Sequence, residues 1–137
     1  MGLKLIIADN GKILVEVPLS PADWHRRELL REVDHLRRDV RRNVEFYEAF
    51  TNANRFRMLH RLLECENHTQ TFTEFMTELG LNPKTIRENA VKLQHIGFIE
   101  SPSRGEYRLS KRGQICFMMT VIAMQRMLRT MREDYDE

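Results

Sequence analysis

The chain has 137 residues, 42% of them apolar and 31% charged, which is enough for one globular domain with a modest core. Its formal net charge of +2 is too small by itself to indicate a nucleic-acid-binding protein. Asp9 interrupts the first apolar run, and the longest one, residues 115–124, is shorter than the ~20 residues of a membrane-spanning helix. We therefore expect a soluble, cytoplasmic protein.

Residues 1–19 are predicted to form a β-hairpin, because Asn10-Gly11 can supply the two positive φ angles of a type I′ turn. The register expected from this turn pairs Asp9 with Lys12, Ala8 with Ile13 and Ile6 with Val15. Both faces are then largely apolar, with Ile6, Ala8, Ile13, Val15 and Val17 on one face and Leu3, Leu5, Ile7 and Leu14 on the other. A lone hairpin is marginal in water, so we expect it to pack on the chain's own helices or on a second subunit.

Residues 20–45 are predicted to form a long helical arm. Ser20-Pro21 is typical of a helix start, and no helix breaker follows before about Phe50. Apolar residues then recur in alternating steps of four and three, with Asn43 at one core position: Leu29, Val33, Leu36, Val40, Tyr47 and Phe50. This spacing indicates either a dimeric coiled coil, with Leu29, Val33, Leu36 and Val40 in the seam, or an amphipathic helix lying on its own domain. Four arginines are candidates for a secondary DNA contact: Arg37, Arg38, Arg41 and Arg42.

Residues 46–113 are predicted to form a winged helix-turn-helix. Asn52 is the expected cap of a helix that runs to about Glu66, and residues 66–70 are expected to be a polar loop. Thr71 and Glu74 form a capping-box pattern at the start of the next helix, which Gly80 is expected to end in the left-handed conformation.

The second helix of the predicted motif starts at Asn82-Pro83, a cap followed by a first-turn proline, and stops at Gly97. Residues 98–101 and 106–110 are expected to be the two strands of a wing around the turn at 102–105. The predicted fold class is therefore mainly α with small β (α+β), a winged helix-turn-helix with an N-terminal β-hairpin and long flanking helices.

Positive charge is concentrated on this motif. Residues 83–112 hold seven basic and three acidic residues, a net charge of +4, whereas the whole chain carries +2. A helix of this kind fits the major groove, and a wing tip can reach the DNA backbone or minor groove. The candidate DNA-binding residues are Lys84, Thr85, Arg87, Glu88, Asn89, Lys92, Ser103, Arg104 and Arg108.

The same region contains FYEAF at 46–50, NANRFRML at 52–59, Leu62-Leu63, residues 93–99 and YRLSKRG at 107–113. In this order and spacing, these segments resemble the ArsR-like winged-helix regulators, whose pattern is an apolar helix, an Asp-Pro-Thr-Arg-like cap, a second apolar helix, a recognition helix and a wing. The likeness covers about residues 46–113 and implies a DNA-binding transcriptional regulator. The two ends of the chain look most like those of archaeal regulators.

The sequence departs from that family at two points. Ala53 stands where the family usually has proline, and the paired cysteines of its metal-sensing members are absent. Cys65 and Cys116 are isolated, and Cys65 with His68 would give only two ligands where zinc needs three or four. We therefore expect two buried free thiols, no metal and no cofactor.

Residues 114–137 are predicted to be a dimerisation helix and an acidic tail. The helix is expected to start at the cap Ser110 and to end near Arg132, and residues 115–128 are apolar nearly all round it. So small a chain can hardly cover such a helix, so we expect pairing with a second copy through Met118, Met119, Ile122 and Met124. The tail, residues 133–137, is expected to be disordered.

The function expected from these features is that of a homodimeric, nucleoid-associated transcriptional regulator that binds double-stranded DNA. Two alternatives remain open: a chromatin-like protein that coats DNA without reading sequence, and a winged helix used for protein–protein interaction. The sequence shows no phosphate-binding glycine loop, G-x-S-x-G motif or metal-ligand cluster, so we do not expect an enzyme.

Overall fold

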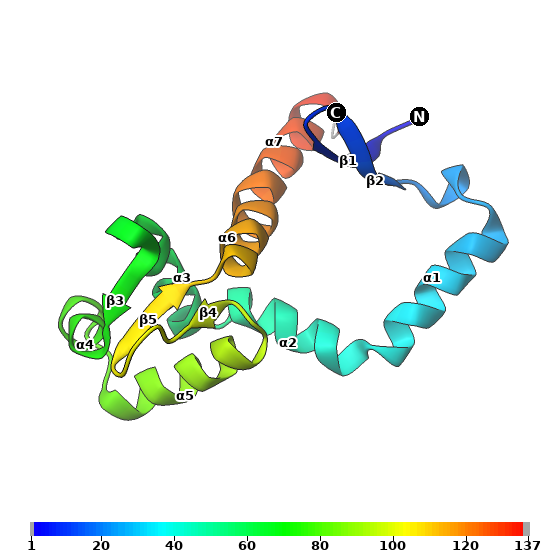
Figure 1. Ribbon diagram of the computed structural model, residues 1–137. Helices are drawn as coiled ribbons and strands as arrows, with labels where there is room; N and C mark the ends of the chain where they lie inside the picture. The colour runs from blue at the N-terminus through cyan, green and yellow to red at the C-terminus, as the bar shows by residue number, and fades with distance from the viewer. Residues whose placement is uncertain (1, 136–137) are drawn as a thin grey trace. The chain divides into compact units, whose positions relative to one another are not determined.

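The computed structural model describes residues 2–135. The chain forms two compact units, Met1–Asn43 and Val44–Glu137 (Figure 1). Helices dominate, and two small antiparallel sheets complete the fold, which confirms the predicted α+β class. No helix within residues 2–135 combines the length and the apolar character that crossing a bilayer requires.

The first unit begins with the predicted hairpin, made of β1 (Lys4–Asp9) and β2 (Lys12–Pro18). Asn10 and Gly11 have φ angles of 50° and 81°, as a type I′ turn requires. The pairs next to the turn are as predicted, but a β-bulge lies beyond them. Ile7 pairs with Val15 and Ile6 pairs with Glu16, so Leu14 has no partner and the predicted Ile6–Val15 pair is wrong.

The bulge separates the two faces of the hairpin by polarity. Paired residues share a face, so Val15 and Val17 lie with Ile7 and Leu5 on a face that is apolar except for the Asp9–Lys12 pair beside the turn. The opposite face contains Lys4 and Glu16, whose side chains form an ion pair of 2.9 Å between Nζ and Oε1. The prediction of two largely apolar faces is therefore corrected to one largely apolar and one mixed face.

The helical arm is not continuous, in contrast to the prediction. Pro21–Asp23 forms only one 3-10 turn (η1), and the Ser20 side chain makes no capping hydrogen bond. Trp24 and His25 are extended, with ψ angles of 145° and 130°, and the Trp24 indole nitrogen donates to the Pro18 carbonyl at 2.9 Å.

Helix α1 (Arg26–Arg38) starts after these extended residues, and α2 (Val40–Thr51) follows a break at Asp39. Asp39 has φ −103° and ψ 23°, outside the helical range, and aspartate is a weak helix former. Leu29, Val33 and Leu36 therefore lie on one helix and Val40 begins another, so the predicted seam is divided.

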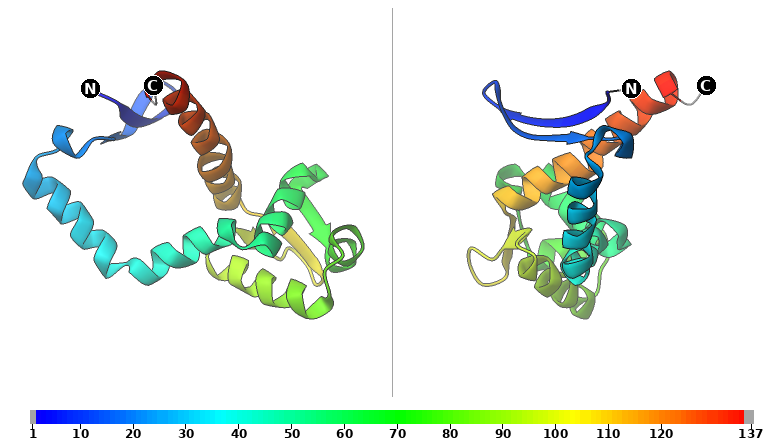
Figure 2. Two further views of the ribbon diagram at one scale, coloured as in Figure 1. Left: turned by 180° about the vertical axis from the view of Figure 1, so that it is seen from behind. Right: turned by 90° about the vertical axis from the view of Figure 1, so that its right-hand side faces the viewer.

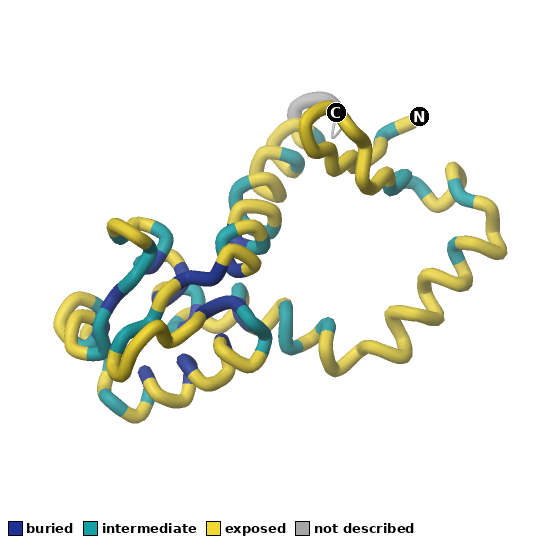
Figure 3. The backbone as a smooth tube through the Cα atoms, viewed as in Figure 1, coloured by how far each residue is buried: buried dark blue, intermediate teal, exposed yellow. Residues whose placement is uncertain are grey.

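The first unit has no core of its own. None of residues 2–43 is buried (Figure 3), although many large apolar side chains are present. The exposed ones are Leu5, Ile6, Ile7, Ile13, Leu14, Val15, Leu19, Leu30, Val33, Leu36 and Val40. A segment without a fully buried side chain gains little hydrophobic stabilisation, so we expect it to need a covering surface to be stable.

The second unit contains the predicted winged helix, from α3 to β5 (Figures 1 and 2). Its elements in chain order are α3 (Ala53–Glu64), η2 (Glu66–His68), β3 (Thr69–Thr71), α4 (Phe72–Leu79), α5 (Pro83–His95), β4 (Ile99–Glu100) and β5 (Glu106–Leu109). Asn52 caps α3, Thr71 and Glu74 form the predicted capping box of α4, and Asn82 caps α5. Gly80 and Gly97 end the two motif helices with φ angles of 64° and 80°.

A third strand joins the wing, where the sequence indicated only a polar loop. β3 pairs antiparallel with β5, so the strand order is β3-β5-β4. Gln70 lies at the middle of β3 and is buried, and its amide nitrogen donates to a Glu78 carboxylate oxygen. The loop prediction for residues 66–70 is therefore wrong at Thr69 and Gln70, because pairing with the remote β5 satisfies backbone groups that no local pattern reveals.

The core of this unit lies between helices α3, α4 and α5 and the sheet. Phe98 contacts Phe46 and Phe50 with ring centroids 5.4 Å apart in each pair, and Phe50 in turn contacts Phe117. Leu59, Ile86 and Leu93 are completely buried beside this aromatic cluster. The apolar faces predicted for α3 and α5 therefore form the core.

The last helical run has three parts: α6 (Lys111–Phe117), the π-helical segment η3 (Met118–Ala123) and α7 (Met124–Tyr135). Ser110 caps α6, as predicted, by accepting a hydrogen bond from the Gly113 amide at 2.9 Å. α7 extends through the first three residues of the predicted disordered tail, which corrects that prediction as far as Tyr135. Asp136 and Glu137 lie outside the described residues.

Gly113 allows α6 to pack against the wing, and this close contact leads to a prediction. A Cβ atom at residue 113 would lie 2.2 Å from the Phe98 carbonyl oxygen. We expect Gly113→Ala to lower the free energy of unfolding by about 2 kcal/mol or more, in spite of alanine's better helix propensity, because backbone must move. Urea unfolding at one protein concentration checks this. Lys111→Ala, at an exposed position of the same helix, should change stability by less than about 0.5 kcal/mol.

Candidate nucleic-acid interface

The two motif helices, α4 and α5, are joined by a tight turn that sets their relative orientation. Gly80 takes the left-handed conformation that ends α4, and its amide donates to the Met76 carbonyl at 3.1 Å. Asn82 accepts a hydrogen bond of 2.8 Å from the Thr85 amide and so fixes the first turn of α5. This geometry is that of a helix-turn-helix, in which the second helix is presented outward.

One face of α5 is buried and the other is free. Ile86, Ala90 and Leu93 are buried in the core, as predicted. Of the candidate DNA-binding residues at the start of the helix, Lys84, Arg87 and Glu88 are exposed and Thr85 is partly buried. The N-terminal half of a recognition helix is the part that reaches base edges, so these four residues are where such contacts would be made.

Two of the charged side chains on this face have neighbours that position them. The Arg87 guanidinium lies 5.2 Å from the centroid of the Phe72 ring, at the start of α4, in a cation–π arrangement. Lys84 Nζ is 3.9 Å from Glu88 Oε1, a solvent-exposed pair that contributes little to stability. The stacking leaves the Arg87 head group exposed while restricting where it points.

The wing carries less free positive charge than its sequence suggests. Arg108 forms an ion pair of 2.7 Å with Glu100, its cross-strand partner, and the Ser103 hydroxyl donates to Glu106 at 2.8 Å. Arg104, at the tip, is exposed and has no ion-pair partner within residues 2–135. Arg104 is therefore the wing cation that is free to meet a phosphate.

Asn89 does not belong to this exposed surface, which corrects the prediction. Its side chain is buried, its amide nitrogen donates to the Thr85 carbonyl at 2.8 Å, and its oxygen accepts from Arg55 Nη1 at 2.9 Å. Both ends of the amide are thus occupied inside the protein. Lys92 is exposed, but it lines a cavity shared with α2 rather than the free N-terminal half of α5.

Arg55 is the residue that sequence analysis missed. It is only 6% exposed, and besides Asn89 it reaches the Glu48 carbonyl, with Nε donating at 3.4 Å. It therefore ties the α2–α3 junction to the middle of α5. The available signal was its position just after the α3 cap, in the segment that resembles the Asp-Pro-Thr-Arg-like motif.

The two thiols lie in partly buried surroundings. Burial raises the pKa of the Cys65 thiol and of the Cys116 thiol, so the protonated form is favoured in both. Both cysteines are free and half-buried, whereas full burial was predicted. Within the described part of the chain, no three His, Cys, Asp or Glu side chains lie close enough together to hold a metal ion.

The Arg55–Asn89 hydrogen bond leads to a prediction about stability. Asn89→Ala leaves a buried guanidinium without one of its acceptors, so we expect the free energy of unfolding to fall by about 1–3 kcal/mol. Chemical unfolding followed by circular dichroism measures the change. Glu88→Ala, one position away and exposed, is the control and should stay within about 0.5 kcal/mol of the original protein.

The chain was compared with protein-family models, curated proteins and solved structures. No family model matches the sequence, and no curated protein matches it. Among solved structures, the chain is similar to the crystal structure of a MarR family transcriptional regulator from Streptomyces coelicolor, with 16% sequence identity and a TM-score of 0.48. The match covers 81% of this chain and 94% of that chain. The similarity concerns the path of the chain and assigns it to no family.

Proposed function

We propose that this chain is a DNA-binding transcriptional regulator that acts as a homodimer. The observation that carries the proposal is the free N-terminal half of α5, with Lys84, Arg87 and Glu88 exposed beside a wing whose tip carries Arg104. In this proposal α5 enters the major groove, and Arg104 contacts the backbone or the minor groove. The resemblance of residues 46–113 to ArsR-like regulators supports the same assignment.

Homodimerisation is proposed because exposed apolar surface occurs in both units. The first unit has no buried residue among 2–43, and the last helical run exposes Ile115, Met118, Met119, Met124 and Leu128. Monomers rarely leave contiguous apolar patches of more than a few hundred Å2 in water. A second copy would cover such patches, and a two-fold axis would place two recognition helices about 34–36 Å apart, one DNA turn.

Two other functions use the same fold. A DNA-coating protein would contact phosphates without reading bases, and a protein-interaction module would not bind DNA. The exposed cations of α5 favour DNA over a protein partner. Arg87 favours base reading over coating, because its head group is positioned by Phe72, and arginine is the side chain that most often reads guanine.

The DNA face predicts different effects for its two free arginines. The DNA probes are a duplex enriched from a random library by the original protein and an unselected duplex of equal length. Arg87→Ala should lose about 1–3 kcal/mol of binding free energy on the enriched duplex, and its preference for this duplex over random DNA should fall. Arg104→Ala should weaken binding to both duplexes equally, and the slope of log affinity against log salt concentration should become less steep by about one.

Fluorescence anisotropy at several salt concentrations gives both quantities. Lys12→Ala, in the hairpin turn of the first unit, removes one positive charge outside the motif and is the matched control. If Arg87→Ala and Arg104→Ala both bind the enriched duplex as tightly as the control, the proposed DNA face is wrong. An original protein with no preference for any enriched duplex would instead indicate the DNA-coating alternative.

The dimer is tested at the last helical run. Ile122→Glu puts a charge among exposed methionines, so we expect loss of the dimer and of tight DNA binding together. Gln125→Glu introduces the same carboxylate at an exposed polar position of α7 and should leave the dimer intact. Light scattering at micromolar concentration measures the mass. A folded monomer of about 16 kDa that binds DNA tightly would refute the dimer.

A further inference from the structure

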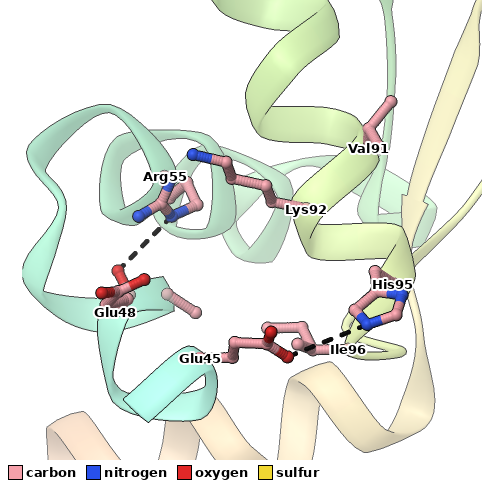
Figure 4. A pocket seen from close by; sticks show the side chains of 8 residues that line it. Glu45, Glu48, Arg55, Val91, Lys92, His95 and Ile96 are labelled. Carbon is pink, nitrogen blue, oxygen red and sulfur yellow. Dashed lines mark hydrogen bonds and ion pairs between the residues drawn. The ribbon is translucent and has the colours of Figure 1, made fainter. Parts of the chain in front are cut away.

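A cavity of about 290 Å3 lies between α2, the first turn of α3 and the C-terminal half of α5 (Figure 4). This volume lies just below the range of about 300–1,000 Å3 that is typical of small-molecule sites. All residues that line it belong to the second unit, and they include both signs of charge. The cavity is distinct from the free N-terminal half of α5.

Two cations meet at one end of the cavity. Figure 4 shows the Lys92 side chain extending towards Arg55, which is more than nine-tenths buried. The hydrogen-bond acceptors of Arg55 are a backbone carbonyl and an amide, both neutral, and within residues 2–135 no carboxylate lies within 4.0 Å of Arg55 or Lys92. An anionic group of a ligand would therefore meet two cations at this end of the cavity that form no ion pair within residues 2–135.

Carboxylates lie beside these cations. Glu45 lies 3.8 Å from the His95 ring, and Glu48 has no ion-pair partner within the described part of the chain. A simple anion would therefore meet repulsion from the two glutamates as well as attraction to Arg55 and Lys92. A ligand that carries both charges avoids this conflict.

The rest of the cavity wall is apolar. Ala49 and Ile96 lie on it, and Val91, which is 63% exposed, is a large apolar side chain without a covering partner on an otherwise polar helix face. An apolar group of the ligand would cover Val91 and gain hydrophobic stabilisation.

We propose that this cavity binds an α-amino acid with an apolar side chain. Its carboxylate pairs with Arg55 and Lys92, its ammonium with the glutamates, and its side chain packs on Val91 and Ile96. The ligand would touch both α2 and the recognition helix, so it would act as an effector. This effector role rests on the proposed DNA-binding function, whereas the binding site itself does not.

The test uses three probes of almost the same shape with the full chain and no DNA. L-leucine carries both charges, 4-methylpentanoate lacks the ammonium, and L-leucinamide lacks the carboxylate. We expect L-leucine, or another of the apolar L-amino acids from alanine to phenylalanine, to raise Tm by a few degrees at about 100 times its Kd. The two single-charge analogues should bind at least tenfold more weakly by calorimetry.

Variants then locate the site. Lys92→Gln and Glu48→Gln remove one charge each at exposed positions, so both should fold, and both should weaken amino-acid binding at least tenfold. Lys92→Arg keeps the charge and should restore most of the affinity. The proposal is overturned if no apolar amino acid binds, if 4-methylpentanoate binds as tightly as L-leucine, or if the two glutamine variants bind normally.

DNA binding is measured separately, so the two proposals can fail independently. With the enriched duplex present, the bound amino acid should change DNA affinity at least about fivefold, the lower range of allosteric coupling. An amino acid that binds without changing DNA affinity would refute the effector role, but the proposed binding site would stand. If the protein does not bind DNA, the calorimetric test of amino-acid binding is unaffected.

Discussion

One buried side chain, Arg55, links helix α5 to α2 and α3. Arg55 donates to the Glu48 carbonyl near the end of α2 and to Asn89 in the middle of α5. Arg55 lies in the first turn of α3, which Asn52 caps. Hydrogen bonds to a buried guanidinium are stronger than those between neutral groups, and each is more costly to lose. The exposed half of α5 therefore has a fixed direction relative to α2 and α3, which a surface that reads DNA needs. The same arginine lines the cavity that we propose as a ligand site, so a ligand bound there would contact a residue that is hydrogen-bonded to α5.

The parts of the fold that could be predicted from sequence are those fixed by neighbouring residues. The capping box at Thr71, the cap at Asn82 and the left-handed Gly80 each act within one turn, so the motif helices were located correctly. The errors involve partners far away in the chain. Gln70 is buried because β3 pairs with β5, and Asn89 faces inward because its acceptor oxygen meets an arginine 34 residues earlier. A polar residue on a helix gives no sign of such a partner.

The first unit shows a different limit of sequence analysis. Its apolar pattern correctly indicated surfaces that need covering, yet neither the Asp39 break nor the bulge at Leu14 follows from that pattern. Both change which side chains share a face, and hence which surface a partner would meet. None of residues 2–43 is fully buried, whereas the winged helix has its own core. The proposed dimer would therefore couple the folding of the first unit to association, and the stability of this unit would then depend on protein concentration.

The π-helical segment Met118–Ala123 has a consequence for how the last helix could have arisen and how it tolerates change. A π turn accommodates one residue more than an α turn, so it is equivalent to a one-residue insertion absorbed without breaking the helix. Deleting one residue there would restore regular α-helix and leave α7 facing nearly the same direction relative to α6, because the extra residue is absorbed within the π turn. The same deletion in the regular helix α7 would instead rotate every later residue by about 100°. The segment is therefore a place where the last helical run can change its length by one residue and keep its apolar residues on the same surface.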